Sequence, residues 1–161
     1  MITVRLLHIL TSIWFISGLL GRWVAYAQAT RATDIQIVGT LLKLSDRFER
    51  LMVIPGSQTV LVLGLLTAWL QGQPLFGFLQ GGQTNWLFVS LLLFISIIPI
   101  VVVVLAPQRK RRLAALDAAL ATGALTLELR AALADRAVIR ARMLELLIIV
   151  VILVLMILKP F

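Results

Sequence analysis

Residues 86–106 read WLFVSLLLFISIIPIVVVVLA, a stretch without one Asp, Glu, Lys or Arg. A helix needs about 20 apolar residues to cross the hydrocarbon core of a bilayer, so this stretch is long enough to span a membrane. Three further apolar stretches lie at 2–25, 51–70 and 143–158. The sequence therefore predicts an all-α polytopic membrane protein in which residues 1–161 form a single four-helix transmembrane domain.

The composition supports the same fold class. Apolar residues make up 61% of the chain, charged residues only 14%, and the mean hydropathy is +1.05. This is more apolar surface than the core of a water-soluble domain needs, so the excess must face lipid. Four crossings leave no room for a separate soluble catalytic domain. Cysteine is absent, which excludes disulfides, thiolate metal sites and cysteine nucleophiles.

The positive charges are sorted along the chain. Most of the fifteen Lys and Arg lie in the connections 26–50 and 107–142, whereas the connection 71–85 has none. Cytoplasmic loops collect Lys and Arg, so the two basic connections are expected inside, with both termini and the 71–85 loop outside a bacterial cytoplasmic (inner) membrane. The net charge of +8 is then expected to meet anionic lipid headgroups rather than nucleic acid.

The first basic connection has the pattern of an amphipathic helix. Thr33 is the expected N-cap, and Ile37, Leu44 and Leu51 share one apolar face. Such a helix is expected to lie along the inner membrane surface. At the inner end of the first crossing, the rings of Trp23 and Tyr26 are expected to mark the inner membrane boundary.

The second basic connection opens with a cluster of cations directly after a crossing. This cluster consists of Arg109, Lys110, Arg111 and Arg112, and it is expected to bind anionic lipid headgroups. Two short helices are expected after it, separated near Gly123. At the start of the fourth crossing, Glu145 is expected to form an ion pair with Arg142 or Arg22.

His8 is the ionisable residue that stands most clearly inside a crossing. It shares a helical arc with Arg5 and Ser12. The imidazole could be an axial haem ligand, a proton carrier or a contact to a quinone headgroup; alternatively, it is a neutral group bonded to a carbonyl or hydroxyl. At the same level, only Met156 could be a second iron ligand, although a Met in an apolar stripe is ordinarily a packing residue. Two copies of His8 in a homodimer could also form a pair.

Several short motifs resemble a known family. They are His8-Ile-Leu, Trp14-Phe15, Gly18, Arg22, the run RLMVIPG at 50–56, and Leu155-Met156 with Lys159-Pro160. Together they resemble domain-of-unknown-function family 2269, predicted bacterial integral membrane proteins, and this resemblance implies four helices and no assigned activity. The opening segment is also similar to the first helix of membrane protoporphyrinogen oxidases and of copper-resistance D-type proteins. That similarity implies haem b as a cofactor with His8 as its ligand. The oxidases place a functional Lys in the third helix, where this chain has none.

The chain lacks the residue patterns of catalysis by protein groups. No paired carboxylates lie in the crossings, and no glycine-rich phosphate loop, metal-ligand spacing or nucleophile beside a base is present in the sequence. We therefore expect a non-catalytic accessory or scaffolding subunit that packs against other membrane subunits, against lipid or against a second copy. The alternatives are a haem- or quinone-binding redox protein centred on His8 and, third, a small-solute transporter.

Overall fold

The computed structural model describes residues 2–75 and 85–159, and within these ranges every regular element is helical. The helices join into four long rods. The first rod is α1 (Ile2–Arg31), and the second consists of α2 (Ile35–Phe48), the π-helical turn η1 (Glu49–Val53) and α3 (Ile54–Leu70). The third rod consists of α4 (Trp86–Pro99), the π-helical turn η3 (Ile100–Leu105) and α5 (Ala106–Thr122). The fourth rod contains α6 (Leu127–Leu133) and α7 (Arg136–Leu158). Each rod contains a segment long and apolar enough to cross a membrane. The predicted four-helix membrane fold is confirmed.

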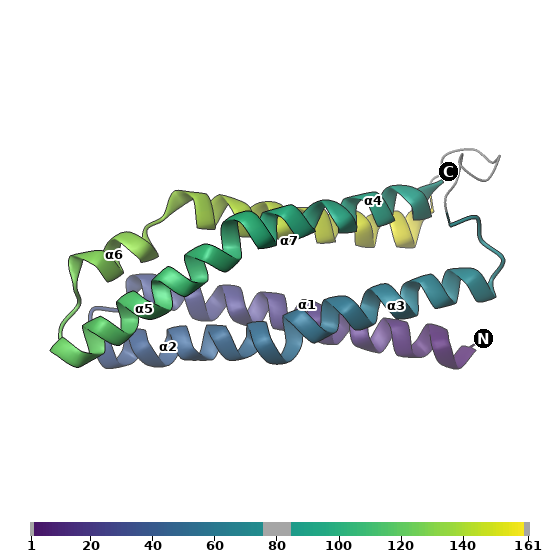
Figure 1. Ribbon diagram of the computed structural model, residues 1–161. Helices are drawn as coiled ribbons and strands as arrows, with labels where there is room; N and C mark the ends of the chain where they lie inside the picture. Colours follow the sequence, from purple (N-terminus) through teal and green to yellow (C-terminus); the bar gives the residue numbers. More distant parts are fainter. Residues whose placement is uncertain (1, 76–84, 160–161) are drawn as a thin grey trace.

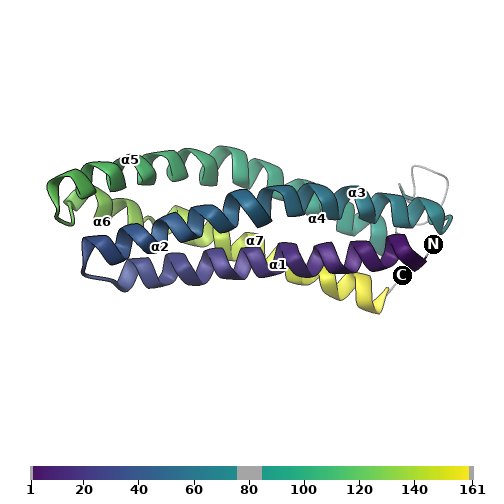
Figure 2. The same ribbon diagram turned by 90° about the horizontal axis from the view of Figure 1, so that it is seen from below.

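The rods lie side by side in two layers (Figures 1 and 2). One layer holds α1 against α2 and α3, and the other holds α4 against α7 and α5 against α6. Residues 2 and 159 lie at one end of the bundle, here called the terminal end. The short connections 32–34 and 123–126 lie at the opposite end, called the turn end. The predicted outer loop, 71–85, falls mostly on residues 76–84, which lie outside the described residues.

Helix α2 begins one residue later than expected. Asp34, not Thr33, is the N-cap, and its Oδ1 accepts hydrogen bonds from the backbone N–H groups of Gln36 at 2.6 Å and Ile37 at 3.1 Å. An Asp accepts these bonds as readily as a Thr, so the sequence alone does not show which of the two residues is the N-cap. The structure decides between them through the extended backbone of Asp34.

The prediction that the 35–48 helix lies along the membrane surface on its Ile37 face is wrong. Helix α2 runs beside α1 along the bundle (Figure 2), and Ile37 and Leu44 are 54% and 41% exposed. Its buried face carries Ile35, Val38, Gly39, Leu42 and Ser45. This face is the buried one because Gly39 has no side chain, which lets Leu116 and Leu120 of α5 approach closely.

Tyr26 also differs from its prediction, because it is only 4% exposed and belongs to the core at the turn end, whereas Trp23 is 41% exposed.

A second core lies nearer the middle of the bundle, where Phe15, Leu19 and Val53 meet apolar residues of α7. Within the first layer, α1 approaches the second rod closely: a Cβ added at Gly18 would lie 2.5 Å from Cβ of Met52. Small residues allow such approaches between membrane helices.

Candidate functional site

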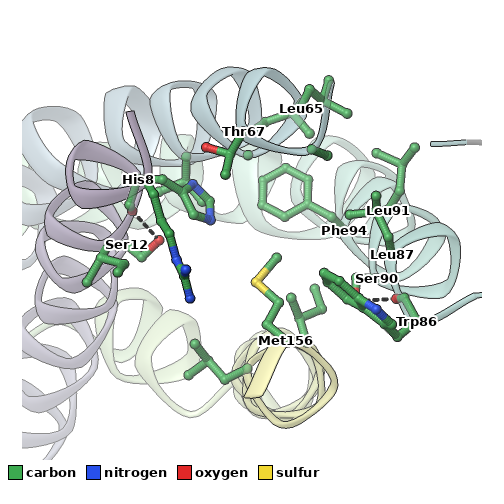
Figure 3. A pocket seen from close by; sticks show the side chains of 18 of the residues that line it. His8, Ser12, Leu65, Thr67, Trp86, Leu87, Ser90, Leu91, Phe94 and Met156 are labelled. Atoms are coloured by element: carbon green, nitrogen blue, oxygen red, sulfur yellow. Dashed lines mark hydrogen bonds between the residues drawn. The ribbon is translucent and has the colours of Figure 1, made fainter. Parts of the chain in front are cut away.

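A cavity of about 630 Å³ lies in the terminal half of the bundle, and all four rods contribute to its lining (Figure 3). Most of the lining is apolar. Phe15 and Val60 come from the first layer, and Phe94 and Ile152 come from the second. The cavity therefore separates the two layers at the level where the chain was expected to cross a membrane.

Polar side chains enter this cavity at several levels. Arg5, His8 and Ser12 come from α1, and Thr67 and Ser90 come from α3 and α4. At the terminal end, Lys159 also contributes, with its Nζ 5.5 Å from the centroid of the Trp86 ring. Since Arg5 and Lys159 both belong to the terminal end, the cavity is cationic there and more apolar toward the middle of the bundle.

His8 packs directly against α3. A Cβ built on Gly64 would lie 3.0 Å from Cε1 of the imidazole, 3.6 Å from Nδ1 and 3.8 Å from Nε2, so the edge between the two nitrogens faces the glycine. The imidazole also interacts with the backbone of Val60. Even so, Nδ1 is enclosed and has no hydrogen-bond partner among the described residues. The nearby hydroxyls of Thr11 and Ser12 donate to backbone carbonyls of α1.

Met156 lines the same cavity as His8. Figure 3 shows its side chain extending from α7 into the space that His8 borders from α1. His8 and Met156, expected at the same level, therefore do line one cavity. Iron ligation by His8 and Met156 stays a prediction, and we assign no chemistry to a haem here.

A buried ion-pair cluster lies below the cavity, toward the turn end. Arg22 donates from Nη1 to Oε2 of Glu49 at 2.5 Å and from Nη2 to Oε2 of Glu145. The side chains of Arg22 and Glu145 are each 4% exposed. The predicted pairing of Glu145 with Arg22 is confirmed. Glu49 was missed because no local pattern relates it to Arg22, 27 residues earlier.

The four cations 109–112 do not act as one cluster. Arg109 pairs with Asp46 at 2.5 Å, Lys110 and Arg111 are exposed, and Arg112 is only 5% exposed. Successive residues on a helix point about 100° apart, so four in a row cannot share a face. Binding of lipid headgroups by Arg109, Lys110, Arg111 and Arg112 stays a prediction, although Arg112 lies in the interior of the bundle and the other three do not.

Tyr26 joins Arg112 to Arg142. The guanidinium carbon lies 5.0 Å from the centroid of the Tyr26 ring for Arg112 and 4.2 Å for Arg142. The Tyr26 hydroxyl donates to the backbone carbonyl of Leu133 at 2.9 Å, which fixes the ring. Both contacts have the geometry of a cation–π interaction.

Comparison with known proteins gives one match. A family model described as "Predicted integral membrane protein (DUF2269)" covers residues 2–160. No curated protein and no solved structure matches the chain. Within residues 2–75 and 85–159, no group of three or more His, Asp or Glu residues is placed to hold a metal ion.

Proposed function

The chain belongs to domain-of-unknown-function family 2269, and we propose that this integral membrane protein is a non-catalytic binding protein for one amphipathic molecule. The observation that carries the proposal is the cavity of about 630 Å³ between the layers. Ligand sites in proteins usually measure about 300–1,000 Å³ and combine an apolar lining with a few polar groups. The cavity meets this description.

The lining indicates the class of ligand. Phe15, Phe94 and Ile152 offer an apolar wall for a hydrocarbon body, whereas Arg5 and Lys159 offer cations for a polar head. All these cations are donors only, so the head must carry hydrogen-bond acceptors. A quinone-like or lipid-like molecule with oxygen atoms at one end has this chemistry, and His8 would contact that end.

The direct test is to extract the purified protein with organic solvent and identify bound molecules by mass spectrometry. We expect a quinone or lipid in a fixed ratio to the protein. In Gly64→Leu the bound amount should fall about tenfold or more, because any side chain at 64 displaces His8, whose Cε1 lies 3.0 Å from a Cβ there.

Val62→Leu is the matched control, since Val62 lies on the same helix, is 63% exposed and does not line the cavity. Equal amounts of ligand in both variants, or none in the wild-type protein, would contradict the proposal. An absorption band of haem that disappears in His8→Ala would replace it with the haem-binding alternative.

A second candidate function is an accessory or scaffolding subunit. The exposure of the third rod favours it: only 6% of its most apolar window is buried within the chain. Lipid or helices of another subunit must cover this face in the membrane. Gentle extraction of native membranes should then yield the protein with other subunits in a fixed ratio, whereas a protein that always purifies alone would argue against this role.

We also propose the orientation and the membrane. In a bacterial inner membrane the turn end would face the cytoplasm, because most Lys and Arg lie toward it. The chain has no Cys, so single-cysteine variants can be labelled without background. In intact cells an impermeant maleimide should label Thr3→Cys and not Arg111→Cys, and both positions are exposed. The opposite result would reverse the orientation.

A further inference from the structure

The buried charges of the bundle are not balanced. Arg22, Arg112 and Arg142 are 3%, 5% and 6% exposed, and the two carboxylates that approach them are Glu49 and Glu145. Three buried cations therefore share two carboxylates. One positive charge is in excess.

Arg22 donates hydrogen bonds to both carboxylates. Its two Nη atoms bind Glu49 and Glu145, and no carboxylate among the described residues forms an ion pair with Arg112 or Arg142. Glu49 attracts both of these cations at longer range, but Arg142 is also repelled by Arg22 and Arg112. Asp46, another carboxylate on this stretch of the second rod, is held by Arg50 and Arg109.

Unused donors remain on the two unpaired guanidiniums. Nε of Arg112 and both Nε and Nη1 of Arg142 are enclosed and lack hydrogen-bond partners. The ring of Tyr26 stabilises the faces of these guanidiniums, and its side chain also attracts Arg112, but the three donor atoms named above have no hydrogen-bond partner. Arginine does not lose its proton in proteins, so the excess charge cannot be removed by deprotonation.

We propose that Arg112 and Arg142 bind a phosphate group beside Tyr26. A buried charge without a counter-ion is strongly unfavourable, and the fork of N–H donors on a guanidinium matches the oxygens of phosphate. The location fits as well: the apolar stretch of the third rod ends at Ala106, and that of α7 begins at Met143. The phosphate would belong to a phospholipid headgroup or be a free phosphate ion, and binding requires the bundle to open locally, because the donors are enclosed.

The test compares the full-length protein with Arg142→Gln in detergent. Thermal unfolding is followed with chloride, with inorganic phosphate at equal ionic strength, and in mixed micelles of phosphatidylglycerol. We expect the phosphate-bearing anion to raise the unfolding temperature of the wild-type protein. Its affinity for Arg142→Gln should be lower by a factor of about ten or more. In chloride alone, Arg142→Gln should be at least as stable as the wild-type protein, because the substitution removes the excess charge.

The matched control is Arg140→Gln, which removes an exposed cation two residues before Arg142 on the same helix and should respond like the wild-type protein. A response to inorganic phosphate identifies a free ion as sufficient, and a response to phosphatidylglycerol alone identifies a headgroup. If neither changes the unfolding temperature, or if Arg140→Gln weakens binding as much as Arg142→Gln, the proposal is wrong. Should Arg142→Gln not fold, Arg112→Lys replaces it: it keeps the charge but loses the fork, and undiminished phosphate binding would overturn the site.

Discussion

Replacing Arg22 by Gln would remove the guanidinium that now lies between Glu49 and Glu145. The side chains of Arg22 and Glu145 are each 4% exposed, and that of Glu49 is 16% exposed. Water therefore cannot readily replace the missing guanidinium of Arg22. Breaking a buried ion pair by removing one partner costs about 3–5 kcal/mol. Arg142 lies one turn before Glu145 on α7 and can take over part of the pairing, so we expect a loss of about 3 kcal/mol.

A loss of that size is easily measured. It corresponds to about a hundredfold change in the folding equilibrium constant. Reversible unfolding in mixed micelles with a rising fraction of sodium dodecyl sulfate, followed by circular dichroism, gives the free energy of unfolding. Arg50→Gln is the matched control. Arg50 pairs with Asp46 at 2.8 Å, but its side chain is 63% exposed, and exposed pairs contribute about 0–1 kcal/mol.

The comparison of these two variants decides whether burial matters at this cluster. If Arg22→Gln and Arg50→Gln lowered the free energy of unfolding equally, Arg22 would be solvated rather than enclosed, and the reasoning from its burial would fail. Glu145→Gln should be milder than Arg22→Gln, because Arg22 would keep Glu49 as a partner. The reverse order would also contradict the arrangement.

Three further substitutions test the packing with the same unfolding titration. Leu19→Ala should lower the free energy of unfolding by about 2–5 kcal/mol, since Leu19 is fully buried, whereas Leu20→Ala, at a position 50% exposed, should lower it much less. Similar losses in the two variants would mean that both side chains face lipid. Gly18→Leu should lower stability by about 1–3 kcal/mol or more, because a Cβ at 18 lies 2.5 Å from Cβ of Met52, and an unchanged protein would rule out that close approach. Asp34→Ala should cost about 1 kcal/mol through the lost N-cap, whereas Thr33→Ala should leave stability unchanged; the opposite ranking would move the start of α2.

The candidate site was partly predictable from the sequence. Helix geometry alone places His8 and Met156 at one level, and these residues do line one cavity. The same geometry could not show that the imidazole edge would face Gly64, because that depends on how closely α1 approaches α3. The contact is possible because Gly64 has no side chain.

The charged cluster shows the limits of local patterns. The sequence suggested Arg22 or Arg142 as partner of Glu145, and the structure selects Arg22, 123 residues away. Glu49 comes from the second rod, and no pattern in the neighbouring residues indicated its pairing with Arg22. Arg112 looked like a member of a surface cluster, yet the rotation of α5 turns it inward beside Tyr26.

Hydropathy and charge are properties that add up along a short stretch, so the sequence by itself determined the four apolar segments, the helical class and the positions of the basic connections. The choice of buried face on α2, the cavity between the layers and the unequal count of buried cations and carboxylates came from the tertiary structure alone. These features depend on the distance and rotation between rods, which arise from contacts between residues far apart in the chain.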